Sequence, residues 1–245
     1  MQRVQNQRDR SLDTICHVAI AIREFEPGRR HAGLFYRVAE EGPIDFLHLA
    51  WHCDLQRDSS FSDKYCWIDP DIPKPRLRQV AALCDDIVAA NLTDGIPYAS
   101  GSPIGAFDDQ TNRFLLGPTR AGLTCASFVL AVFERAKLRL VRYSGWPPPD
   151  QEDISFQQFV LDNLRGRPGV SGEHISAVER EIGTSVRYRP EHVAGAAAIR
   201  GRRPVKYSSA KAIGLDIVRF LRSEQPISQF KFSWWERFLR RFGWL

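Results

Sequence analysis

The sequence predicts an α+β fold in which an antiparallel sheet packs on a central helix that begins at Cys125. Two observations carry this prediction. Three β-rich segments, residues 17–22, 31–38 and 44–52, are separated by turn-forming residues, as in an antiparallel meander. The segment 125–133 is almost entirely apolar, which is typical of a helix buried on all sides.

The other elements follow from periodicity and from helix breakers. Residues 53–65 are polar and are expected to form a loop. Prolines then precede a helix with an apolar face over 77–88. The connection 93–122 contains five glycines and three prolines, and structureless connections of this length are often functional. Later in the chain we expect a strand at 138–143 and helices at 154–164 and 171–183.

Composition indicates a folded protein with an uneven charge distribution. Hydrophobic residues make up 43% of the 245, which is enough for a core and excludes a disordered chain. The net charge is +5, but residues 196–245 hold 11 Lys or Arg against 3 Asp or Glu, so the first 195 residues are net acidic. A basic end favours an anionic partner, such as a membrane surface, a nucleic acid or an acidic protein.

Cysteine usage indicates reduced thiols and no metal framework. The five cysteines are an odd number and form no CxxC pair, so we expect no disulfide scaffold, metal or cofactor. The start of the chain lacks a convincing secretion signal, and no apolar run approaches the roughly 20 residues of a membrane helix. A cytoplasmic setting is therefore expected. The cysteines are Cys16, Cys53, Cys66, Cys84 and Cys125.

Cys125 has the position of an activated thiol. Thr124 can cap the helix that starts there, and the helix dipole and first-turn N–H groups favour a thiolate. A nucleophilic cysteine also needs a base and a group that orients the base. The other interpretation of Cys125 is a packing residue at a buried helix start.

Histidines on the meander are the candidate partners of Cys125. His31 opens the second strand and His48 lies inside the third, so a hairpin would place them side by side. We assign His31 as base and His48 as orienting group. His52 and His17 stay alternatives for these roles, and each histidine also fits a structural role.

Four short segments resemble a known superfamily. "HAGLFYRV…FLHLAW", "IPYASG" and "LTCASFVLAVF" resemble the paired strands, the Pro-Tyr-x-x-Gly segment and the cysteine helix of NlpC-type papain-fold peptidases and of lecithin:retinol acyltransferase relatives. Histidine precedes cysteine here, as in the circularly permuted members. The Asn-Cys-Glu-His-Phe signature of the acyltransferases is absent.

The resemblance implies a fold, a domain division and a site. It implies a permuted papain-like core over 1–150, with 151–245 as a helical, basic extension that packs on or covers it. It implies Cys125, His31 and His48 as catalytic residues. Tyr98 and Thr124 are the candidates for oxyanion or substrate binding, beside the Cys125 N–H.

The function expected from these residues is that of a cysteine-dependent hydrolase of the amidase or peptidase type. A peptide, amide or acyl ester would pass through a thioacyl-enzyme. Two alternatives remain. One is a lipid-directed acyltransferase or thioesterase held on an anionic membrane by the aromatic and basic segment 228–245, which also fits a terminal helix docked on the core. The other is an inactive papain-like binding scaffold. "RGRRPVK" lacks a nucleic-acid motif, so nucleic acid is not an expected partner.

Overall fold

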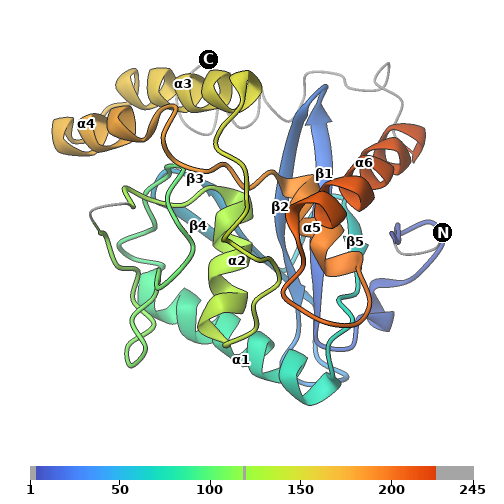
Figure 1. The fold of residues 1–245 in the computed structure, drawn as a ribbon. Coiled ribbons are helices and arrows are strands. Elements are labelled where there is room, and N and C mark those ends of the chain that lie inside the picture. The colour runs from blue at the N-terminus through green and yellow to red at the C-terminus, as the bar shows by residue number, and fades with distance from the viewer. Residues whose placement is uncertain (1–3, 118–119, 225–245) are drawn as a thin grey trace.

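A computed structural model describes residues 4–117 and 120–224 and has an α+β fold (Figure 1). Five strands form one antiparallel sheet in the order β4-β3-β2-β1-β5, so the predicted meander is confirmed as the adjacent strands β1, β2 and β3. The strands are β1 Val18–Glu26, β2 Arg29–Tyr36, β3 Asp45–Trp51, β4 Asp54–Asp58 and β5 Cys66–Ile68.

Helices lie over the sheet and beyond one end of it. Figure 1 shows α2 crossing in front of the sheet, α3 and α4 as a pair at one end, and α5 and α6 beside β1. A short 3-10 turn, Leu12–Thr14, precedes β1. The α-helices of the described residues are α1 Lys74–Asn91, α2 Cys125–Arg135, α3 Gln151–Arg165, α4 Gly172–Glu181, α5 Pro190–Ala198 and α6 Tyr207–Glu224.

Alternation along the strands gives the sheet two apolar faces. Leu34 and its neighbours at period two join the main core with α1 and α2. Phe35 points the other way and packs with Phe46, Tyr65 and Trp67 in a second, smaller cluster. Both faces of β2 are buried, which explains why its sequence is apolar at nearly every position.

Most expected elements are present, and two expectations are wrong. The helices expected near 77–88, 154–164 and 171–183 are α1, α3 and α4, and the Cys125 helix is α2. The segment expected as a loop, 53–65, contains β4, because a mostly polar strand at the sheet edge carries little hydrophobic signal. The segment 138–143 forms no strand; its β pairing is a single bridge between Val141 and Val205.

The C-terminal part contributes to the same core as the first 150 residues. Val160, Val193 and Ile217 belong to the main cluster, and α5 packs against β1, β2 and α2. Close approach of α5 and α6 needs glycine, since a Cβ on Gly195 would overlap the Ala210 carbonyl oxygen. The expected membrane segment 228–245 lies outside the described residues. Among the helices described, none is long and apolar enough to cross a membrane.

Candidate functional site

His31 and His48 meet at one end of the sheet. The distance from His31 Nε2 to His48 Nδ1 is 2.9 Å, and His48 Nε2 lies 3.2 Å from Asp58 Oδ2. The three side chains come from β2, β3 and β4, three neighbouring strands. They form a chain of hydrogen bonds from a buried imidazole to a half-exposed carboxylate.

Strand register and one glycine make this pairing possible. The β2–β3 ladder ends at Leu34 and Leu47, so both histidines lie just beyond it, with Gly33 against His48. A Cβ on Gly33 would lie 2.8 Å from the His48 Cβ and 2.5 Å from the Phe46 ring. Glycine therefore leaves room for the His48 ring, which stacks on Phe46 with centroids 4.3 Å apart.

The surroundings of His31 keep its imidazole neutral. Burial lowers its pKa well below the ordinary 6.5, and the nearby charges of His48 and Arg23 lower it further. Arg23 is the cross-strand partner of His31 on β1 and is itself buried. A neutral imidazole can accept a proton, which a general base requires.

Cys125 begins α2 inside a capping box. The Thr124 hydroxyl accepts the Ser127 N–H, and the Ser127 hydroxyl accepts the Thr124 N–H. Thr124 thus fixes the start of the helix, as expected of a cap. The thiol is only 5% exposed.

Burial raises the pKa of the Cys125 thiol, contrary to the thiolate expected from its helix position. The Ala32 N–H, the Tyr98 hydroxyl and the positive charge of Arg187 act in the opposite direction. Ala32 follows His31 on β2, so the thiol lies beside the strand that carries the expected base. At rest, the Cys125 thiol is therefore protonated and the His31 imidazole is neutral.

Tyr98 lies against the start of α2. Its hydroxyl interacts with both the thiol and the backbone N–H of Cys125. The segment that carries it is held by a parallel bridge to Leu123 and by contact of the Tyr98 ring with Trp51, centroids 4.6 Å apart. The structure therefore brings the expected Tyr98 and Cys125 together.

Arg187 and Asp58 are functional candidates that the sequence did not reveal. Arg187 lies 62 positions after Cys125 in the extension, bonds Asp153 at 3.3 Å and covers the Phe156 ring at 3.7 Å. No local pattern points to it. Asp58 lay in a segment expected to be a loop; a strand there puts Asp58 opposite Phe46, on the same face of the sheet as His48 and diagonal to it.

The two alternative histidines have other surroundings. His17 is level with Arg37, at the opposite end of β2 from His31, and its Nδ1 lies 3.2 Å from the Arg37 carbonyl oxygen. His52 follows β3 after a bulge, and its Nδ1 accepts the Tyr98 N–H at 3.3 Å. His31 and His48 bond each other, and His31 precedes Ala32, whose N–H bonds the Cys125 thiol.

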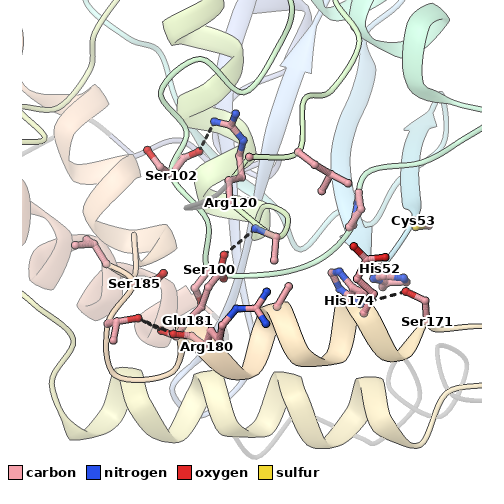
Figure 2. Close-up of a pocket in the computed structure, with 18 of the residues that line it drawn as sticks. His52, Cys53, Ser100, Ser102, Arg120, Ser171, His174, Arg180, Glu181 and Ser185 are labelled. Atoms are coloured by element: carbon pink, nitrogen blue, oxygen red, sulfur yellow. Dashed lines mark hydrogen bonds between the residues drawn. The ribbon is translucent and has the colours of Figure 1, made fainter.

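A cavity of about 890 Å³ adjoins the segment that carries Tyr98 (Figure 2). It is bounded by α4, by the connection on both sides of Tyr98 and before Cys125, and by the chain after α4. Cys125 and His31 do not line it. Separately, Cys16, His17 and Glu40 each offer a ligand atom within 4.8 Å of the others, a group that could hold a metal ion.

No family model, curated protein or solved structure matches this chain. The function proposed below therefore rests on the chain's own residues.

Proposed function

We propose that this protein is a cysteine-dependent hydrolase of the amidase or peptidase type, with a papain-like core in permuted order. The observation that supports this most is the hydrogen-bond chain from His31 through His48 to Asp58, together with the bond from the N–H of Ala32, the residue after His31, to the Cys125 thiol. It has the parts of a nucleophile, a base and an orienting group, on rigid strands and a helix.

In the proposed reaction, the Cys125 sulfur attacks the carbonyl carbon of the substrate. His31 accepts the thiol proton at Nδ1, since its Nε2 is bonded to His48. The same proton then passes to the leaving amine or alkoxide as the carbon–nitrogen or carbon–oxygen bond breaks. Water, deprotonated by His31, hydrolyses the thioacyl-enzyme and releases a carboxylate.

His48 and Asp58 would act through His31. The bond from His48 fixes the ring and tautomer of His31, and Asp58 stabilises the positive charge that develops along the pair. The Cys125 N–H at the start of α2 would stabilise the oxyanion, with the Tyr98 hydroxyl beside it. Thr124 would hold this N–H in place as the cap.

A second candidate is an inactive scaffold that only binds a partner. The burial of Cys125 and the raised pKa of its thiol favour it, because a sealed thiol is unreactive. The third candidate, a membrane acyltransferase or thioesterase, depends on residues 228–245, which lie outside the described part of the chain. Loss of liposome binding on removal of those residues would support it.

Site-resolved alkylation separates the enzyme from the scaffold. At pH 7 we expect iodoacetamide to modify Cys125 much faster than Cys84, which is fully buried on α1 with its thiol pKa raised by burial. Replacing the base, His31→Gln, should lower the rate of Cys125 alkylation at least tenfold, within the range for loss of general-base assistance. Equal rates at the two cysteines, with no effect of His31→Gln, would favour the scaffold.

A further inference from the structure

The cavity that adjoins the Tyr98 segment has the size of a ligand site. Its volume of about 890 Å³ lies within the usual range for small-molecule pockets. Figure 2 shows α4 along one wall, with the loops that carry Ser100 and Arg120 opposite. Because the cavity does not contain the residues proposed for catalysis, it needs an explanation of its own.

Glu181, in the last turn of α4, presents an unsatisfied oxygen to this cavity. Its side chain is buried; Oε1 accepts the Ala121 N–H at 2.8 Å and the Ser100 N–H also interacts with the carboxylate, but Oε2 is buried and makes no hydrogen bond of good geometry with the described residues. Burial raises the pKa of Glu181 to about 7. A buried acceptor left unpaired is costly, so a ligand that donates to Oε2 would stabilise this arrangement.

His174 presents a second unsatisfied atom two turns earlier on α4. The His174 ring interacts with the Tyr98 backbone carbonyl, its Nε2 is buried and makes no hydrogen bond of good geometry with the described residues, and the ring centroid lies 4.5 Å from that of His52. His52 also lines the cavity and accepts the Tyr98 N–H. The wall of the cavity thus continues into the segment that contacts Cys125.

Arg180 supplies a positive charge on the same wall. Its side chain lines the cavity and extends from α4 between Glu181 and His174 (Figure 2). Arg120 also lines the cavity, but its guanidinium donates to the carbonyls of its own loop, including those of Ile104 and Gly105. Arg180 is therefore the guanidinium placed to bind a ligand carboxylate.

We propose that this cavity binds a small zwitterion, an amino acid or short peptide with free termini. Its ammonium group donates to Glu181 Oε2 and its carboxylate accepts from Arg180. The binding does not depend on the proposed hydrolysis, because none of these residues belongs to the Cys125 site.

The test uses ligands that differ by one charge. Isothermal titration calorimetry with the dipeptide Ala-Ala should show saturable binding to the full-length protein. N-acetyl-Ala-Ala, which lacks the ammonium, and Ala-Ala amide, which lacks the carboxylate, should each bind about tenfold more weakly or worse, the usual effect of losing a charge-assisted hydrogen bond. The same titrations with Cys125→Ser remove any contribution from turnover.

Protein variants assign the contacts. Glu181→Gln should weaken the binding of Ala-Ala about tenfold and leave the binding of N-acetyl-Ala-Ala unchanged. Arg180→Gln should likewise weaken the binding of Ala-Ala about tenfold, and it should leave the binding of Ala-Ala amide unchanged. The control is Glu179→Gln, the same change on the same helix at an exposed residue that does not line the cavity. The proposal would be overturned if Ala-Ala shows no binding at 10 mM, a concentration ~10-fold above a millimolar Kd. Equal binding of all three ligands would also overturn it. Both results come from the unaltered protein, so they hold even if a variant fails to fold.

Discussion

At the scale of single residues, burial decides the protonation of His31, and nearby charge adds to its effect. The His31 imidazole is buried beside the rings of His48 and Tyr65, and the buried guanidinium of Arg23 lies across from it on β1. Both features oppose an imidazolium, so the pKa of His31 lies below its ordinary value. The site is therefore arranged to receive a proton rather than to hold one.

This predicts the pH dependence of Cys125 reactivity. The part of Cys125 alkylation that depends on His31 should persist below pH 6.5, because a lowered pKa keeps the imidazole neutral there. Removing the neighbouring charge with Arg23→Gln should raise the His31 pKa and move this acidic limb to higher pH. The measurement is the alkylation rate from pH 5 to 8, a range of about 1.5 units on either side of the ordinary histidine pKa. Arg78→Gln, an exposed arginine on α1, should leave the limb unchanged.

At the scale of elements, two close backbone contacts hold the start of α2 beside Tyr98. Leu123 forms a bridge with Tyr98, and the Leu123 N–H donates to the Pro97 carbonyl at 2.9 Å. Gly122 lies directly against this carbonyl, and an added Cβ would lie 2.5 Å from the Pro97 carbonyl carbon. The connection 93–122 thus ends as a fitted support for the cysteine helix, although it contains no helix or regular strand in its described part.

Gly122→Ala should therefore disturb both stability and reactivity. We expect a loss of about 1–3 kcal/mol in the free energy of unfolding, typical of an overpacked site, measured by urea denaturation. The rate of Cys125 alkylation should also change in this variant. Gly172→Ala is the control, because a Cβ there meets nothing within 4 Å. Equal effects of the two substitutions would show that the Gly122 contact is not required.

Sequence patterns predicted elements where one property dominated. Alternation and turn residues revealed β1 to β3, and a continuous apolar run revealed α2. They missed β4, which is mostly polar, and α5, whose alanines and glycine pack closely without a clear period. The His31–His48 pair could be anticipated from the hairpin, but Arg187 could not, since only the folding of α3 and α4 brings it to Cys125.

At the scale of the whole molecule, one core joins the N-terminal and C-terminal parts. Side chains from the sheet, α2, α5 and α6 form a continuous cluster. Four histidines with lowered pKa values are enclosed by this structure: His31, His52, His174 and His192. Each is held neutral, chiefly by burial.

This predicts loss of stability in mild acid. A lowered pKa means that the unfolded chain binds protons first, so stability present above pH 6.5 is lost as the pH falls toward the folded values, about 4 for His52 and His192. Glu181 has the opposite effect on stability, because its pKa is raised to about 7 in the folded protein. It is one group against four histidines. The denaturation midpoint should fall as the pH is lowered from 6.5 to 4. In His192→Gln the midpoint should depend less steeply on pH. A midpoint that rises over this range would contradict the prediction.

One ion cluster has a consequence for how a substrate reaches the thiol. Arg30, the residue before His31, bonds Glu24 on β1 at 2.9 Å and Glu191 on α5 at 2.8 Å, with all three side chains buried. The strand that carries the imidazole is therefore clamped at its first residues to the sheet on one side and to a helix on the other. A substrate then reaches the Cys125 thiol by displacing the segments that cover the sulfur, while the His31 imidazole stays in place.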